Sequence, residues 1–258
     1  MVGVAAGMAM RGIRPFCYSM VPFVLFRPLD QVRCDICSMR LPVTLVGVGG
    51  GLTYGLEGMT HHAIEDFAVT RALPNLVTVS PGDPIECVAL LKEIVTIDGP
   101  CYLRLGANND ANIHHGTPDI RLGKLACLSH QGTCAIITTG TMLSCCLEAV
   151  RELAAQGVDC RLYSAHTIKP LDEAGIAAIA ESCAAIVSVE EHSVVNGLGT
   201  AVAETLFQTG YRGLYRKIGL PDAYADRLGH RKWLLEEYGL APSNIADVVL
   251  SMHKSSCS

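Results

Sequence analysis

The chain has 258 residues, of which 50% are hydrophobic and 17% charged, and its net charge is −5. This composition excludes a disordered tail, a coiled coil and a disulfide-stapled miniprotein, and the length predicts one large or two modest domains. The acidic balance excludes a footprint for nucleic acid or an anionic membrane, and no apolar run reaches the roughly 20 residues of a membrane span. We therefore expect a cytoplasmic protein that binds a small, polar or phosphorylated ligand.

Short β-branched runs alternate with longer helical patterns, which is typical of parallel sheets with crossover helices. In the first part of the chain, Thr60 is expected to cap one helix. Asp83 is expected to cap the next, which runs through Val88, Leu91 and Val95. The expected elements, in chain order, are a helix at 2–10, strands at 15–19 and 43–48, the helix capped by Thr60, a strand at 76–80, the helix capped by Asp83, and a strand at 101–105.

A polar stretch from Gly106 to about Asp119, which includes Asn108 and Asn109, predicts a linker. The elements expected beyond it are strands at 134–139, 158–165, 185–189 and 215–218, with helices at 143–157, after Asp172, after Gly197, and around Trp233 and Ile245. The sequence thus predicts an α/β fold with two open parallel-sheet domains, at residues 1–112 and 120–258.

The usual short motifs assign no chemistry. Cys34 and Cys37 form a CxxC without a second pair at zinc-ribbon spacing, so we expect no metal site, and we interpret the 12 cysteines as reduced packing residues. A glycine run at 47–51 follows a predicted strand, but Leu52 takes the place of the last glycine of a dinucleotide fingerprint.

A group of polar residues remains at the ends of predicted strands, where ligands bind in open α/β sheets. Glu57, Thr60 and His61 follow the glycine run, and Arg104 ends a strand. A histidine at a helix N-terminus is disfavoured as a cation and suits a hydrogen bond to a carbonyl or hydroxyl. In the alternative interpretation, one of His61 and His62 has only a structural role: it caps the helix and packs against its neighbours.

Further motifs occur in a fixed order. They are YS (18–19), PF (22–23), DQVR (30–33), LPV (41–43), GMTHH (58–62), RALPN (71–75), PGDP (81–84) and DGP (98–100), then TGT (139–141), KPLD (169–172), VEEH (189–192), GLG (197–199) and IGLPD (218–222). The first set resembles the pyrimidine-binding domain of transketolases without its N-terminal part, and the second resembles the transketolase C-terminal domain. The resemblance covers the whole chain and is nearest to the small subunit of transketolases that are split into two chains.

This resemblance implies thiamin diphosphate bound between two chains, with specific roles for residues of this one. Phe23 would pack on the aminopyrimidine ring, and Met20 would lie where one-chain transketolases place another aromatic residue. His61 would hydrogen-bond the hydroxyl and carbonyl of the sugar, Glu57 would lie near the donor hydroxyl, and Arg104 would meet the acceptor phosphate.

Two family features are absent from the sequence. The GDG pattern that holds the diphosphate and Mg²⁺ does not occur, so the resemblance implies that a partner chain supplies it. The catalytic glutamate of the family lies in a Gly-Ile-Ala-Glu-Gln stretch that would immediately precede Met1. We interpret this as a start codon placed too late or a truncated chain; the alternative is a gene that begins here and encodes an inactive product.

The resemblance therefore predicts the small subunit of a transketolase that moves a two-carbon ketol unit between sugar phosphates. It implies an α2β2 assembly with a large, diphosphate-binding subunit, and inactivity of this chain alone. Two alternatives stay open. One is a non-catalytic assembly protein of the same fold, and the other is a related enzyme that makes deoxyxylulose phosphate or acts as the β subunit of a 2-oxoacid decarboxylase.

Overall fold

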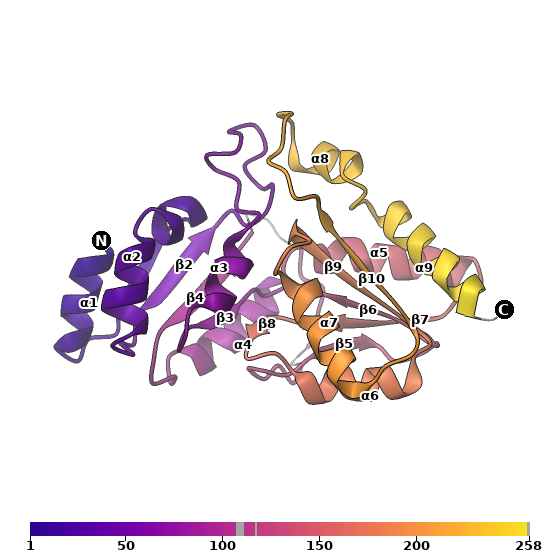
Figure 1. Cartoon of the computed structure of the whole chain (residues 1–258), viewed down its shortest axis with the longest axis horizontal. Coiled ribbons are helices and arrows are strands. Elements are labelled where there is room, and N and C mark those ends of the chain that lie inside the picture. Colours follow the sequence, from indigo (N-terminus) through magenta and orange to yellow (C-terminus); the bar gives the residue numbers. More distant parts are fainter. Residues whose placement is uncertain (107–110, 117, 257–258) are drawn as a thin grey trace.

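The computed structural model of the protein describes residues 1–106, 111–116 and 118–256. Within them two five-stranded sheets are flanked by helices, one sheet in each half of the molecule (Figure 1). The first sheet has the order β1 (Phe16–Met20), β2 (Thr44–Val48), β4 (Cys101–Leu105), β3 (Val77–Val79) and β8 (Thr167–Lys169). The second has the order β10 (Leu214–Leu220), β9 (Ala185–Ser193), β6 (Cys134–Thr138), β7 (Cys160–Ser164) and β5 (Ala126–Ser129). Both sheets are parallel apart from their antiparallel edge strands β8 and β5, so the predicted α/β class is confirmed.

The helices agree with most of the predicted capping signals. Those of the first half are α1 (Val2–Met10), α2 (Leu29–Gln31), α3 (Asp66–Ala72) and α4 (Pro84–Ile94), with π-helical turns η1 (Pro22–Phe26) and η2 (Val32–Cys37). Those of the second half are α5 (Met142–Ala155), α6 (Glu173–Ser182), α7 (Leu198–Thr209), α8 (Arg231–Glu237) and α9 (Pro242–Ser256). Asp83 and Asp172 cap α4 and α6, because each side chain accepts a hydrogen bond from a backbone N–H of the first helical turn.

One local prediction was wrong. The helix expected to start at Thr60 begins only at Asp66, because the backbone of Ala63 pairs with Gly51 instead of entering a helical turn. Val88 is 56% exposed, since the buried face of α4 is formed by Glu86, Leu90 and Ile94.

The described part of the expected linker, residues 111–116 and 118–119, contains no helix or strand, and Asn108 and Asn109 lie outside the described residues. The two halves are nevertheless joined by backbone pairing that the sequence did not predict. Strand β8 comes from the second half of the chain and pairs with β3, with Thr78 opposite Lys169.

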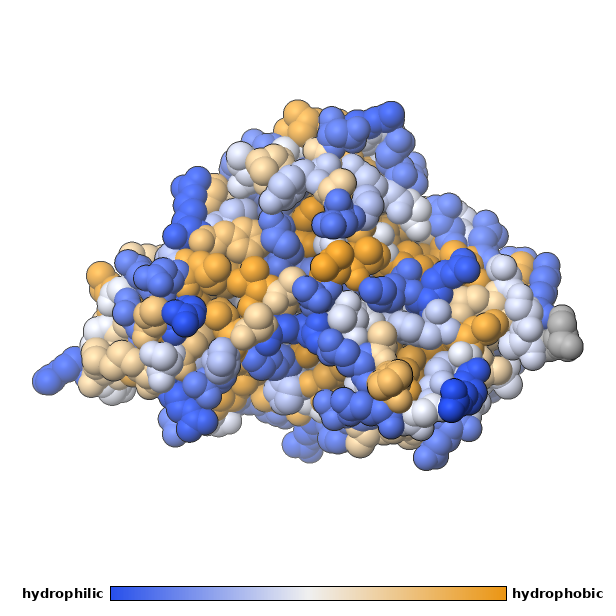
Figure 2. All heavy atoms as spheres, in the orientation of Figure 1, coloured by the Kyte–Doolittle hydropathy of each residue, from blue (hydrophilic) through white to orange (hydrophobic). Residues whose placement is uncertain are grey.

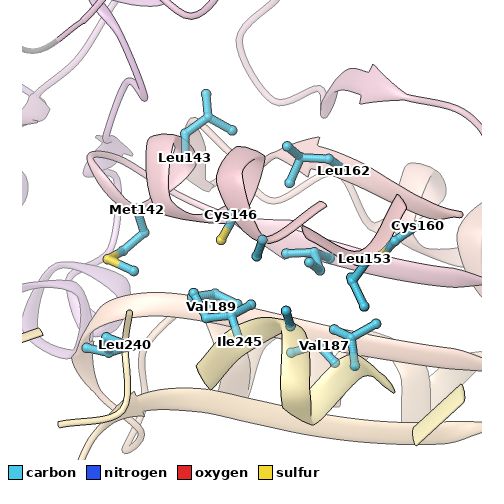
Figure 3. Packing of buried hydrophobic residues seen from close by; sticks show 14 of the residues in the cluster. Met142, Leu143, Cys146, Leu153, Cys160, Leu162, Val187, Val189, Leu240 and Ile245 are labelled. Atoms are coloured by element: carbon cyan, nitrogen blue, oxygen red, sulfur yellow. The ribbon is translucent and has the colours of Figure 1, made fainter. Parts of the chain in front are cut away.

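The core of the second half lies between its sheet and the helices α5 and α9. Figure 3 shows side chains from these three parts pointing toward one another. The labelled members are Met142, Leu143, Cys146, Leu153, Cys160, Leu162, Val187, Val189, Leu240 and Ile245. Leu52 and Ile64, which flank a loop of the first half, belong to the same apolar cluster. That loop is therefore anchored in the core of the other half.

A buried carboxyl group joins α4 to the segment after β4. Glu86 has no exposed surface, accepts a hydrogen bond from Gly82 N at 2.6 Å, and lies 3.1 Å from His114 Nε2. Burial raises the pKa of Glu86 from 4.5 to about 7. The folded protein keeps this proton up to about pH 7, whereas the unfolded chain releases it near pH 4.5. The folded state therefore binds more protons in this window, and its stability falls as the pH rises through it.

Glu86→Gln is expected to reduce this pH dependence. The neutral glutamine removes the share of Glu86 in the slope of the unfolding free energy against pH, which is up to ~1 kcal/mol per pH unit between about pH 5 and 7. Burial also raises the pKa of Glu190 to about 7, so the share of Glu190 in this slope is retained. The measurement is the free energy of urea unfolding at several pH values in this range. Glu93→Gln is the control, because Glu93 lies on the same helix and also accepts a backbone hydrogen bond, from Leu122 N, but is only partly buried. An unchanged slope in Glu86→Gln would contradict the buried, protonated carboxyl.

Candidate active site

His61 and Phe23 meet at the carboxyl-terminal edge of the first sheet. Phe23 lies in η1, directly after β1, and His61 lies in the segment 49–65 that connects β2 to α3. Their ring centroids are 5.3 Å apart with an interplanar angle of 76°, an edge-to-face arrangement. Met20 ends β1 on the same edge, and all three side chains are partly exposed. The structure thus brings together residues that the sequence singled out from two separate stretches.

Two residues beside this pair were not singled out from the sequence. The ring of Tyr54 also stands edge-on to His61, with centroids 6.5 Å apart. The guanidinium of Arg27 lies over the Phe23 ring, 4.1 Å from its centroid. Arg27 follows Phe23 by four residues in the same helical segment, whereas Tyr54 and His61 meet within the irregular loop.

Thr60 sets the possible tautomers of His61. Its Oγ1 lies 3.0 Å from His61 Nδ1. When the hydroxyl donates to Nδ1, the proton resides on Nε2, which then serves as a donor to a ligand. Glu57 is exposed and lines a separate cavity of about 140 Å³ together with Gly229 and Arg231. The two proposed sugar-binding residues therefore lie on one loop with different surroundings.

Arg104 lies in a different environment from the one expected for a phosphate ligand. It is 3% exposed, and its Nε is 2.9 Å from Asp66 Oδ2. Its Nη2 donates to the carbonyl oxygens of Ala63 and Glu191 at 2.9 and 3.0 Å, and its guanidinium lies over the ring of Phe67. These contacts give a phosphate role no support, because the guanidinium is enclosed by protein groups.

The glycine run is explained by packing. Gly49 and Gly51 have φ values of +84° and +67°, which disfavour residues with a side chain. A Cβ at Gly49 would collide with the Tyr54 ring, one at Gly50 with Arg104, and one at Gly51 with the carboxyl group of Glu191. The run therefore lets three side chains approach the backbone at the base of the loop.

The surroundings of Phe23 fit a planar aromatic ligand. Its ring is partly exposed and lines a cavity of about 440 Å³ together with Met1, Val2 and Arg27. An accessible aromatic ring beside an open cavity can stack on a heterocycle, so this site fits the pyrimidine half of thiamin diphosphate.

Other kinds of site are not evident in the described part of the chain. Among residues 1–106, 111–116 and 118–256, no cluster of three His, Cys, Asp or Glu side chains is arranged to hold a metal ion. Over the same residues, no helix combines the length and apolar character that crossing a membrane requires.

Two family models match the chain. The model of the transketolase pyrimidine binding domain matches residues 1–110, and that of the transketolase C-terminal domain matches residues 123–245. The 6-deoxy-6-sulfo-D-fructose transketolase subunit SqwH of Clostridium sp. (strain MSTE9) is 35% identical over 95% of this chain and 76% of its own length. A solved structure described as a split gene transketolase, inactive β4 tetramer, has a TM-score of 0.88 and 32% identity, over 97% of this chain and 80% of that one.

A longer relative matches over a smaller share of its length. The 1-deoxy-D-xylulose-5-phosphate synthase of Heliobacterium modesticaldum is 33% identical over 96% of this chain, but the match covers only 38% of that protein. By contrast, this chain matches the transketolase subunit SqwH and the split gene transketolase over most of their length. The chain belongs to the transketolase family, among the subunits of split transketolases that combine a pyrimidine-binding and a C-terminal domain.

Proposed function

We propose that this chain is the small subunit of a thiamin-diphosphate-dependent transketolase that transfers a two-carbon ketol unit between sugar phosphates, and that it is inactive alone. The observation that carries this proposal is the contact between Phe23 and His61 at the strand ends of the pyrimidine-binding domain. This contact supports one site with an aromatic surface and a hydrogen-bonding imidazole.

The proposed roles of the residues are those that the resemblance implies, and the chemistry of each side chain suits its role. Phe23 and Met20 hold the pyrimidine ring, while the diphosphate and Mg²⁺ are held mainly by the partner chain. When bound, thiamin diphosphate supplies the carbon that accepts the ketol unit. His61 donates a hydrogen bond to the sugar oxygen on which negative charge develops, and Glu57 accepts one from the donor hydroxyl. For Arg104 we propose a structural role, because it is buried against Asp66.

An apolar crest beside the site supports a partner chain. The loop that carries His61 and the segment before α8 lie side by side at the top of Figure 1, and Gly229 N donates a hydrogen bond to Gly55 O. In Figure 2 an apolar group stands at the tip of this crest, beside hydrophilic ones. Leu56, Met59, Tyr224 and Leu228 are 47% to 62% exposed there. Exposed apolar groups beside a binding site are typical of an interface, and we propose that the large subunit covers them in an α2β2 assembly.

Two further predictions remain part of this proposal. The domain boundaries 1–112 and 120–258 agree with the two family matches, although β8 crosses between the halves. The second is a cytoplasmic location, which the composition argument supports.

Reconstitution tests the function. The chain is mixed with a large transketolase subunit, thiamin diphosphate, Mg²⁺, a ketose phosphate donor and an aldose phosphate acceptor, and the two-carbon-extended product is measured. Because the family's Gly-Ile-Ala-Glu-Gln stretch does not occur in the 258 residues, the assay includes a version extended by that stretch. We expect the extended version to be active only with the large subunit, and the unextended version to be slower by ~10²–10⁴.

The other outcomes identify the alternatives. Product formation from pyruvate in place of a ketose would indicate a deoxyxylulose phosphate synthase or a 2-oxoacid decarboxylase. A stable complex of both versions with the large subunit, without turnover on any donor, would indicate a non-catalytic subunit. Turnover by the chain alone would contradict a split active site.

A further inference from the structure

The loop that carries Glu57 and His61 is closed at its base by a short backbone pairing. Gly51 N donates to Ala63 O at 2.8 Å, and Ala63 N donates to Gly51 O at 2.9 Å. The side chains next to this pairing, Leu52 and Ile64, are 1% and 5% exposed and pack in the core of the second half. The position of the loop is therefore determined by whatever holds its base.

Glu191, at the end of β9, holds the base from the other half of the molecule. Its side chain is 1% exposed, and Oε1 accepts a hydrogen bond from Leu52 N at 2.9 Å. Its carbonyl oxygen accepts from Arg104 Nη2, and the same nitrogen donates to Ala63 O. Glu191 thus contacts one strand of the base directly and the other through Arg104.

Arg231, at the start of α8, holds Glu191 in turn. Its Nε lies 3.0 Å from both carboxylate oxygens, and its Nη2 lies 2.6 Å from Oε2 and 2.8 Å from Thr141 Oγ1. The fork of an arginine fixes the plane of a carboxylate in a way that the point charge of a lysine does not. Arg231 therefore both neutralises Glu191 and orients it toward Leu52.

We propose that the Glu191–Arg231 pair is a positioning device that sets the conformation of the loop 52–63, and through it the placement of Glu57 and His61. The assignment of these two residues to the reaction rests on the proposed function, but the coupling of the pair to the loop does not. This positioning role accounts for the VEEH motif at 189–192, which has no role in the candidate active site.

Hydrogen exchange of the isolated chain tests the coupling. Arg231→Met removes the fork, and we expect exchange in peptides covering 52–63 to accelerate by about tenfold or more, the effect of losing one hydrogen bond to a charged group. Glu191→Gln, which keeps an acceptor for Leu52 N, is expected to give a smaller increase. Unchanged exchange in these peptides would overturn the proposal, and so would an equal increase throughout the chain.

Arg71→Met is the matched control. Arg71 also joins the two halves, through Glu204 at 2.7 Å and the carbonyl oxygens of Asn196 and Gly197, but it does not contact the loop. Its side chain is 18% exposed, against 28% for Arg231. We expect exchange at 52–63 to stay at the wild-type rate in this variant. An increase there equal to that of Arg231→Met would show a general loosening of the halves and overturn the proposal.

Kinetics of the reconstituted enzyme give a second readout. In Arg231→Met we expect kcat to fall about tenfold with little change in KM for the donor. Misplaced groups weaken the binding of the transition state more than the binding of the substrate. Arg231→Lys is expected to recover part of this loss. A change in KM alone would overturn the link to His61. If no variant or wild-type enzyme turns over, the proposed function fails, whereas the exchange result still decides the role of the pair.

Discussion

His61→Ala is expected to lower kcat/KM of the reconstituted enzyme on a ketose donor by ~10²–10⁴, the largest effect of any substitution in the site. The imidazole is held between the edge contact with Phe23 and the Thr60 hydroxyl, 3.0 Å from Nδ1. This arrangement leaves Nε2 as the nitrogen that can face a sugar oxygen. Alanine removes this hydrogen-bond donor together with the edge contact to Phe23.

Two comparisons separate this role from a structural one. His61→Gln keeps an amide donor and should recover part of the lost activity, while Thr60→Val should give a smaller loss by releasing the ring. His115→Ala is the distant control, because this histidine is exposed in the segment after β4. Assembly with the large subunit is checked by gel filtration for each variant. Wild-type kinetics in His61→Ala, with assembly intact, would exclude His61 from the reaction.

The sequence predicted those parts of the fold that depend on neighbouring residues. The caps Asp83 and Asp172 each contact a backbone N–H three residues further along, so a local pattern reveals them. The pairing of β8 with β3 instead joins Thr78 to Lys169, and no local signal encodes a contact over that separation. The start of α3 was misplaced for a related reason, since the pairing of Ala63 with Gly51 overrides the local capping signal of Thr60.

The candidate site was predictable to a similar extent. The resemblance led to Phe23 and His61, and the structure places them in contact. It included Glu191 in the VEEH motif without a role and did not indicate Arg231, and both approach the loop from the other half of the chain. The glycine run carried the available signal, because three adjacent residues without side chains indicate that something must pack closely on them.

Arg104 ends a strand but is enclosed by protein groups. An arginine at the carboxyl end of a parallel strand is well placed for a ligand, and the resemblance implies that it meets the acceptor phosphate. Its burial depends on Asp66, which has no exposed surface and also accepts a hydrogen bond from Tyr102 OH at 2.7 Å. The aspartate begins α3, so its distance from Arg104 is set by how the helix lies on the sheet.

Arg104→Ala is accordingly expected to lower the free energy of unfolding by ~3–5 kcal/mol, because it leaves the Asp66 carboxylate buried without its cation. The carbonyl oxygens of Ala63 and Glu191 also lose their donor. The measurement is urea unfolding followed by circular dichroism. Arg71→Ala is the control, since its ion pair with Glu204 is partly exposed and should contribute no more than about 1 kcal/mol.

The double variant Arg104→Met with Asp66→Asn separates the charge effect from packing. An uncharged pair of similar volume removes the uncompensated carboxylate, so it should regain much of the stability lost in Arg104→Ala even though the guanidinium is gone. A phosphate-binding role predicts the opposite pattern: Arg104→Ala would keep the wild-type unfolding free energy, and in the reconstituted enzyme KM for a phosphorylated acceptor would rise. That pattern would contradict the structural role, because removing a guanidinium that neutralises a buried carboxylate has to lower the stability.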